Sequence, residues 1–284
     1  MDERRSVVVT GASTGIGRAA VKGLLDAGFH VFPTVRKDAD ADELRQQFGA
    51  NVTVLMVDLR DEASVRAAGA TVSEAGPLFG LVNNAGAALP GPLEYLPIEV
   101  FREQLEINLT AQLLMTQVML PALRRSAEAD GDARIVMIGS IGGRIAGPII
   151  GAYQAAKHGL VGLTGALRAE LAPSGIRVIL LEPGAIATPI WRRGMAAVDQ
   201  IQTGRQEEFA RYGAQLEGAR RLAERGSRNG VPPEVPARKI VESLTSEHPA
   251  PRAVVGRDAR VVAAMVRVLP FRVLYRLLAA RRGS

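Results

Sequence analysis

The chain alternates short apolar runs with longer amphipathic segments. Residues 7–10, 30–35 and 52–57 are apolar runs of strand length, and the segments between them repeat apolar residues every three or four positions. Unbroken apolar runs are typical of strands buried on both faces of a parallel sheet, and the longer period is that of a helix. The pattern predicts further strands at 80–83, 134–138 and 177–181, and helices at 17–27, 42–48, 63–75, 97–123 with a break near 110, and 152–171.

This alternation predicts an α/β fold. Strands that alternate with helices form a parallel sheet covered on both faces, the doubly wound arrangement of Rossmann type. The length of 284 residues favours one large domain over two small ones, and no repeat or low-complexity linker divides the chain. Within residues 1–284 we expect a core over about 6–190, a helical substrate lid over about 191–230 and a helical extension over about 258–284.

Composition and charge exclude several kinds of chemistry. There is no cysteine, so disulfides, thiolate catalysis and cysteine-ligated metals are ruled out. The three histidines have no metal-ligand spacing, so no metal site is expected. The net charge is +6, yet residues 252–284 hold eight arginines against the single acid Asp258, so the remainder is close to neutral. A basic tail with few aromatic residues does not predict a nucleic-acid interface, which needs basic side chains spread over a docking face.

The two ends of the chain bear on where the protein is expected to reside. Charged residues stand directly before the first strand, so we expect no signal peptide, and no apolar run is long enough to span a membrane. We therefore expect a cytoplasmic protein. Residues 271–280 predict an amphipathic basic helix, which packs within the protein or an oligomer, or lies on an anionic membrane surface; packing is favoured. Its apolar face holds Phe271, Leu274, Leu277 and Leu278, opposite Arg272 and Arg276.

A glycine-rich turn follows the first strand and opens the first helix. Its sequence, from Thr10 to Gly17, is T-G-A-S-T-G-I-G. Glycines at such a turn let a pyrophosphate approach the backbone at a helix N-terminus, where free N–H groups favour an anion. The spacing is G-x-x-x-G-x-G, and the alternative is an ordinary glycine-rich connection.

Tyr153 and Lys157 form the pattern with the clearest chemistry. Their spacing places both side chains on one face of a helix. A fixed ammonium beside a phenol favours the phenolate and lowers the tyrosine pKa from about 10 toward neutrality. Ser140, after the strand at 134–138, is placed to hydrogen-bond a substrate oxygen. Proton transfer to or from an alcohol oxygen suits this trio, although a Tyr–Lys pair alone often marks only an exposed helix face.

Taken together, these motifs resemble the short-chain dehydrogenases/reductases. The shared features are T-G-A-S-T-G-I-G, the tetrad Asn83-Asn84-Ala85-Gly86, Asn108, Ser140, the Tyr153–Lys157 pair and Pro183-Gly184, in the order and spacing of that family over about residues 6–190. The resemblance implies an NAD(P)-dependent enzyme that acts on CH–OH donors. It also implies a homodimer or homotetramer that packs through the helices bearing Asn108 and Tyr153.

The resemblance also assigns cofactor-binding residues. Asp58 is implied to accept from the adenine amino group, although a strand-end aspartate also suits a turn. Thr188 is implied to hold the nicotinamide carboxamide with the Ile186 backbone, and it also suits a helix N-cap. The full implied set is Gly11, Ser13, Thr14, Gly15, Ile16, Gly17, Arg36, Asp58, Leu59, Asn84, Ala85, Gly86, Tyr153, Lys157, Pro183, Gly184, Ile186 and Thr188.

The end of the second strand bears on the choice between NADP and NAD. A carboxylate there accepts from the ribose hydroxyls of NAD, whereas this chain has Arg36 and Lys37. A guanidinium pairs with a 2′-phosphate in bidentate fashion, and the Ser13 hydroxyl could support it. We therefore favour NADP. Asp38 and Asp40 keep NAD possible, and a solvated Arg–Lys pair is the structural alternative.

The implied catalytic set is Asn108, Ser140, Tyr153 and Lys157. Tyr153 is implied to act as general acid and base, Ser140 to orient the substrate oxygen, and Lys157 to lower the Tyr153 pKa and to bind the nicotinamide ribose. Asn108 is implied to anchor a water that links Lys157 to solvent, or else has only a structural duty. Gly139 and Ala156 stand where the family usually has serine.

The substrate end is less well defined. Residues 91–97, 141–144 and 182–191 resemble those of 17β-hydroxysteroid, retinol and 3-hydroxybutyrate dehydrogenases. That likeness implies a hydrophobic, steroid- or retinoid-like alcohol and its ketone or aldehyde. The alternatives are a noncatalytic dinucleotide-binding sensor, an NAD-dependent dehydrogenase of a small hydroxy acid, and a sugar epimerase or dehydratase, for which this chain has little room.

Overall fold

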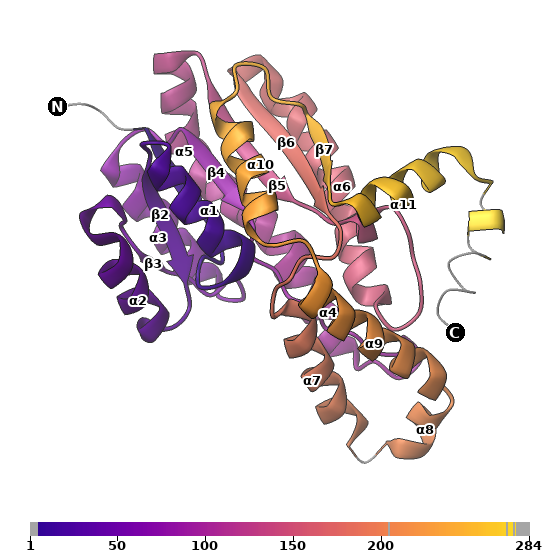
Figure 1. The fold of residues 1–284 in the computed structure, drawn as a ribbon. Helices are drawn as coiled ribbons and strands as arrows, with labels where there is room; N and C mark the ends of the chain where they lie inside the picture. Colours follow the sequence, from indigo (N-terminus) through magenta and orange to yellow (C-terminus); the bar gives the residue numbers. More distant parts are fainter. Residues whose placement is uncertain (1–4, 204, 271, 275, 277–284) are drawn as a thin grey trace.

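The computed structural model describes residues 5–203, 205–270, 272–274 and 276. Its centre is a seven-stranded sheet in the order β3-β2-β1-β4-β5-β6-β7, in which every neighbouring pair is parallel (Figure 1). This order reverses direction between β1 and β4, as in a doubly wound sheet. The strands are β1 (Ser6–Val9), β2 (His30–Val35), β3 (Leu55–Met56), β4 (Gly80–Asn83), β5 (Ala133–Ile138), β6 (Ile176–Pro183) and β7 (Arg252–Val255).

Helices cover both faces of this sheet, and each face has its own apolar core. One core joins inward side chains of α1, α2 and α10 to the sheet, and the other joins α3, α5 and α6. Strand side chains alternate between them, so that Val7 and Val9 face the first core and Val8 faces the second. The covering helices are α1 (Gly15–Asp26), α2 (Asp38–Phe48), α10 (Glu234–Thr245), α3 (Glu62–Ala75), α5 (Ala111–Asp130) and α6 (Gly151–Leu171).

Most predicted elements are present, with three differences. The strand predicted at 52–57 is shortened to β3, because a 3-10 turn at Gly49–Asn51 precedes it and Val52 makes only an isolated bridge to Val31. The edge strand β7 and helix α10 were not predicted. The long helix predicted at 97–123 is α4 (Ile98–Leu105) followed by a π-turn at Glu106–Thr110 and then α5, so the break expected near 110 is a π-bulge.

The segment after β6 is helical, and we call it the lid; its role as a cover over the substrate stays a prediction. It contains α7 (Ile190–Gln202), α8 (Gln206–Ala210) and α9 (Gly213–Asn229), which project beyond one end of the sheet (Figure 1). These helices share a small separate core around Val198, Phe209 and Leu216. The isolated bridge between Ile186 and Val231 ties both ends of the segment together.

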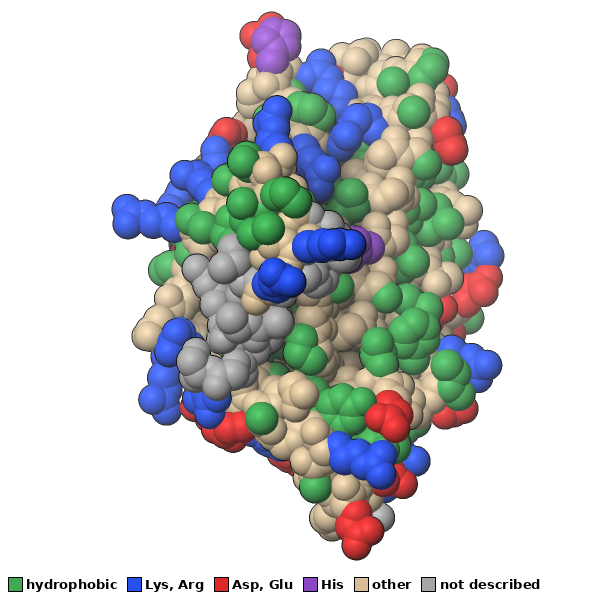
Figure 2. Space-filling view, turned by 90° about the vertical axis from the view of Figure 1, so that its right-hand side faces the viewer, with side chains coloured by type: hydrophobic (Ala, Val, Ile, Leu, Met, Phe, Trp, Pro, Cys, Tyr) green, Lys and Arg blue, Asp and Glu red, His purple; other side chains and the backbone are tan. Residues whose placement is uncertain are grey.

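The C-terminal part continues past β7 as α11 (Arg257–Val268), which leaves Val261 and Val268 exposed. Figure 2 shows hydrophobic and basic side chains mixed on the face that carries this part of the chain. The amphipathic helix expected at 271–280 lies mostly outside the described residues. None of the helices described is both long and apolar enough to cross a membrane.

Candidate active site

A pocket of about 600 Å³ opens at the carboxyl ends of the strands. Connections that follow β1, β2, β4, β5 and β6 meet there, as expected for the crevice of a doubly wound sheet. Every residue of the predicted sets lines it except two: Gly17, which lies against Gly11, and Asn108, which hydrogen-bonds Ala87. The lining members are Gly11, Ser13, Thr14, Gly15, Ile16, Arg36, Asp58, Leu59, Asn84, Ala85, Gly86, Ser140, Tyr153, Lys157, Pro183, Gly184, Ile186 and Thr188.

The glycine-rich turn forms one wall of the pocket. Gly11 and Gly15 have φ of 66° and 59°, a region that residues with a Cβ seldom adopt. Position 17 requires glycine for a steric reason, because a Cβ there would lie 2.3 Å from the Gly11 carbonyl oxygen. Among the described residues, no side chain caps the first turn of α1, whose N-cap is Thr14. The turn therefore offers free N–H groups at the positive end of a helix.

The loop after β4 is fixed by hydrogen bonds to its neighbours. The Thr10 hydroxyl accepts from the N–H groups of Asn84 and Ala85, each at 2.9 Å, and the Asn84 amide donates to the Thr10 carbonyl at 2.8 Å. Asn108 is fully buried in the π-turn; its amide donates to the Ala87 carbonyl at 2.8 Å and accepts from the Ala87 N–H at 2.9 Å. Its side chain thus holds the loop, and the implied water link to Lys157 stays a prediction.

Tyr153 and Ser140 meet at the inner end of the pocket. The Ser140 hydroxyl accepts from the Gly142 N–H at 3.0 Å and hydrogen-bonds Tyr153. The Trp191 ring lies edge-on to the Tyr153 ring, with 5.1 Å between centroids. Burial raises the pKa of Tyr153 above its usual 10, and the bond with Ser140 only partly offsets this. The expected lowering of the tyrosine pKa is therefore wrong in direction for this structure.

Lys157 explains that difference. Its ammonium donates to the Ile138 carbonyl at 2.8 Å and lies 5.9 Å from the centroid of the Tyr153 ring. Burial lowers the pKa of Lys157 to about 8, because a charged ammonium is poorly solvated there. The lysine is thus held by the carboxyl end of β5, and burial of the phenol is the largest influence on the pKa of Tyr153. Tyr153 is protonated at neutral pH, which is the form of a general acid.

The other end of the pocket is rich in charge. The Arg60 guanidinium donates to both oxygens of Asp58, at 3.1 and 2.6 Å, and lowers the pKa of that carboxyl to about 2. Asp58 lies two residues beyond β3, where the sequence predicted the end of a strand. Arg36 lines the pocket directly after β2, together with Lys37 and Asp40. The charges suit a phosphate at this end.

A buried carboxylate, Glu182, binds two arginines next to the pocket. Glu182 is fully buried near the end of β6 and accepts from Arg144 at 2.9 Å and from Arg252 at 2.6 Å. Arg144 follows the turn that begins at Ser140, and Arg252 begins β7. Burial opposes the charge of Glu182, yet the hydrogen bonds from Arg252 and Arg144 lower its pKa. This network joins the Ser140 turn, the Pro183–Gly184 connection and the edge strand.

Three residues of the site were missed at the sequence level. Arg60 holds Asp58, Trp191 packs against Tyr153, and Arg193 lines the pocket from the first turn of α7; no spacing rule predicts these contacts. Trp191 comes just after the region that resembles the family, and its place two residues after Pro189 was the only sequence feature that pointed to the pocket.

These features fit a dinucleotide. The uncapped α1 turn suits a diphosphate, and the side chains after β2 suit the adenosine ribose or its phosphate. Gly11, Gly15 and Gly17 leave the wall free of side chains. Lys157 and Thr188 line the end near Tyr153, where a nicotinamide ring would meet a substrate.

Comparisons with known proteins agree with this geometry. A model of the short chain dehydrogenase family matches residues 5–198. The chain is 33% identical to an NADPH-dependent 3-dehydrocapnine reductase from Ornithobacterium rhinotracheale, over 95% of this chain and 94% of that protein. A short-chain dehydrogenase structure from Streptomyces avermitilis superposes with a TM-score of 0.79, at 26% identity and with coverage of 100% and 99%. A short chain dehydrogenase from Burkholderia cenocepacia in complex with NADP gives 0.73, at 25% identity, covering 99% and 98%.

Proposed function

Because this chain belongs to the short chain dehydrogenase family, we propose that it is an NADP(H)-preferring enzyme that interconverts a hydrophobic alcohol and its ketone or aldehyde. That it is an NAD(P)-dependent oxidoreductase follows from the family and its relatives. The observation that carries the proposal is Tyr153, a buried phenol at the inner end of a dinucleotide-shaped pocket.

The residues divide the reaction between them. The Ser140 hydroxyl orients the substrate oxygen, and the Tyr153 phenol donates a proton to it in the reducing direction. The cofactor supplies a hydride when bound, so one hydride and one proton convert a carbonyl to an alcohol. The Lys157 ammonium, held at the Ile138 carbonyl beside Tyr153, stabilises the phenolate that remains once the proton has been donated. The raised pKa keeps the Tyr153 phenol protonated at neutral pH, which is the form that donates a proton in the reducing direction.

Support for NADP comes from both the chain and its relatives. Arg36 and Lys37 stand at the end of β2. The Ornithobacterium relative is described as NADPH-dependent, and the Burkholderia structure holds NADP. Support for a hydrophobic substrate comes from Leu89, Ile190 and Trp191 in the pocket lining, of which Trp191 packs edge-on to Tyr153. A steroid- or retinoid-like compound is our specific proposal.

The test is reduction of a carbonyl panel with NADPH or NADH, monitored by loss of reduced nicotinamide. The panel contains bulky ketosteroids, retinal and short keto acids. We expect NADPH-dependent reduction of the bulky compounds. Replacing Arg36 by Leu should reduce the NADPH-over-NADH preference by about 10- to 100-fold, the value of a charge-assisted hydrogen bond. Arg45→Leu is the matched control, because Arg45 lies on α2 outside the pocket and pairs with Asp42.

Two results would contradict the proposal in separate ways. Equal use of NADH by the unaltered enzyme would remove the role of Arg36 but leave the mechanism. Preference for short keto acids would remove the hydrophobic substrate and favour the hydroxy-acid alternative.

A further inference from the structure

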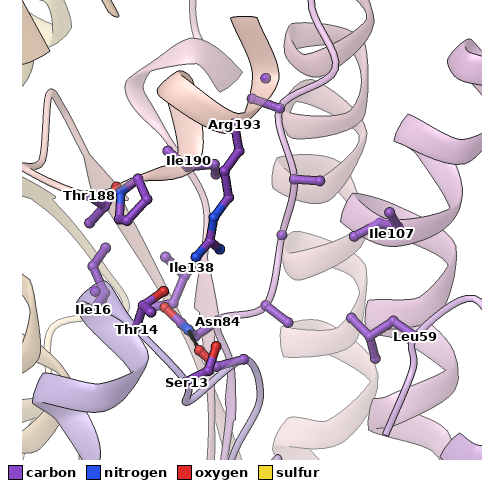
Figure 3. A pocket seen from close by; sticks show the side chains of 18 of the residues that line it. Ser13, Thr14, Ile16, Leu59, Asn84, Ile107, Ile138, Thr188, Ile190 and Arg193 are labelled. Carbon is purple, nitrogen blue, oxygen red and sulfur yellow. Dashed lines mark hydrogen bonds between the residues drawn. The ribbon is translucent and has the colours of Figure 1, made fainter. Parts of the chain in front are cut away.

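Arg193 is a cation that points into the pocket from the lid. It lies in the first turn of α7, and its N–H donates to the Pro189 carbonyl at 3.0 Å. Figure 3 shows its side chain extending down from α7, with the guanidinium turned toward Thr14, Asn84 and Ile138. Within the part of the chain that the structure describes, the guanidinium has no hydrogen-bond or ion-pair partner. The Arg193 side chain is exposed, so water solvates its charge, and an anion that entered the pocket would meet this cation.

The wall that faces Arg193 is also positive. Thr14 is the N-cap of α1, and the first turn of that helix has no acidic residue. The free N–H groups there carry the partial positive charge of the helix dipole. Two positive features that face one another across a pocket are both stabilised by an anion between them. The glycine turn supplies only dipoles, so a dianion would gain a full opposing charge from Arg193.

The other cations of the pocket lining are placed for different tasks. Lys157 is buried and donates to the Ile138 carbonyl. Arg36 and Lys37 follow β2, on the far side of β1 from β4 and its loop. Arg193 therefore stands apart from both groups, opposite the turn that suits a diphosphate.

Close backbone contacts fix the segment that carries Arg193. At its start, a Cβ on Gly15 would lie 2.9 Å from the Thr188 methyl group, so Thr188 packs on the glycine turn. Directly after Arg193, a Cβ on Gly194 would lie 2.4 Å from the Ala88 carbonyl oxygen, so α7 abuts the loop after β4. Contacts at residues 188 and 194 thus hold Arg193 over the space between two pocket walls.

We propose that Arg193 binds the diphosphate of the dinucleotide and completes, from the lid, the anion site that the glycine turn begins. The guanidinium donates to phosphate oxygens, in the bidentate manner that its planar fork allows. The inference rests on the proposed function only in taking a dinucleotide as the ligand. Arg193 thereby couples the position of the lid to the presence of the cofactor.

The test is calorimetric titration of the full chain with NADPH and with NADH. Arg193→Met should raise the dissociation constants of both by about 10- to 100-fold, because the diphosphate is common to them. Arg193→Lys should recover part of the affinity. Arg192→Met is the matched control, since Arg192 is an exposed neighbour on the same helix that does not line the pocket, and it should change neither constant. Inorganic pyrophosphate should compete with NADPH less well in Arg193→Met than in the unaltered protein.

Other outcomes separate this inference from the proposed function. If the unaltered protein binds neither dinucleotide, the proposed function fails, and this inference with it. If it binds both and Arg193→Met binds them equally well, only the inference fails. A loss confined to NADPH would place Arg193 on the 2′-phosphate, and unchanged cofactor binding with a raised KM for acidic ketones would place it on the substrate; either result overturns the diphosphate contact.

Discussion

The sheet edge and the lid form two walls of one pocket, and they differ in how their polar side chains are buried and bonded. At the sheet edge, polar side chains are buried and bound: Asn108 holds Ala87, and Glu182 holds two arginines. In the lid, ion pairs such as Arg221 with Glu217 lie more than half exposed, around a small core. Exposed pairs stabilise little, whereas a buried charge is costly unless it is fully bonded.

The difference indicates a division of labour. Tyr153, Ser140 and Lys157 belong to the rigid side, where geometry must be kept to a fraction of an ångström. Trp191 and Gly194 anchor the other side to the pocket, through the Tyr153 ring and the Ala88 carbonyl. Beyond them, the exposed ion pairs lead us to expect more mobility in α8 and α9 than in the sheet.

The largest expected effect tests the rigid side. Tyr153→Phe removes the proton donor and leaves the ring that packs against Trp191. We expect kcat to fall by at least about 10³-fold, within the range for loss of a general acid, while the dissociation constant of NADPH changes little. Single-turnover reduction and calorimetry measure the two quantities. Substantial residual turnover would remove Tyr153 from the mechanism and restore the dinucleotide-sensor alternative.

The next effect compares a buried carboxylate with an exposed one. Glu182→Gln leaves Arg144 and Arg252 without a counter-charge and should lower the free energy of unfolding by about 3–5 kcal/mol. Glu217→Gln in the lid, whose partner is Arg221, should cost less than about 1 kcal/mol. Urea unfolding at pH 7 measures both changes. Equal losses would show that the two sides do not differ in the way that their exposure indicates.

The stabilising effect of the Glu182 carboxylate should depend on pH. The pKa of Glu182 is lower in the folded protein than its usual 4.5, so the folded state binds fewer protons there. Its stabilising effect is therefore present above about pH 4.5 and is lost as the pH falls through the folded pKa. The difference in stability between the unaltered protein and Glu182→Gln should shrink on acidification.

The smallest effect concerns Lys157, whose folded pKa of about 8 lies below its ordinary 10.5. Between these values the unfolded chain binds more protons, so stability rises with pH. Relative to Lys157→Met, the unaltered protein should gain about 2 kcal/mol between pH 8 and pH 10. Unfolding of both proteins at these pH values measures the gain. Parallel curves would show that the buried lysine stays charged, held by the Ile138 carbonyl.

The sheet could be predicted where strands are buried on both faces. The runs at 30–35 and 80–83 match β2 and β4, whose central residues Val31, Phe32, Leu81 and Val82 are apolar and buried. The edge strand β7 and the individual lid helices were not predicted. β7 is four residues long, begins with Arg252 and follows Pro251, so its sequence resembles a loop. The lid helices were not individually predicted, because their sequence is rich in charge and their apolar residues form only a small separate core.

The site shows the same division. Backbone-dependent motifs placed Gly11, Asn84 and Ser140 on one pocket, because each follows a predictable strand. The pKa of Tyr153 could not be predicted from its spacing to Lys157, since burial of the phenol and its hydrogen bond with Ser140 determine it. Arg193 could not be predicted either, because its role depends on how α7 crosses the sheet edge.

The contact between Trp191 and Tyr153 has an optical consequence. Trp191 is the sole tryptophan of the sequence, and it stands in the first turn of the lid against the proposed proton donor. Its fluorescence therefore reports on one place in the molecule, without a label or an added mutation. Reduced nicotinamide absorbs where tryptophan emits, so quenching through energy transfer would signal a cofactor beneath the lid, and a spectral shift would signal movement of the lid itself.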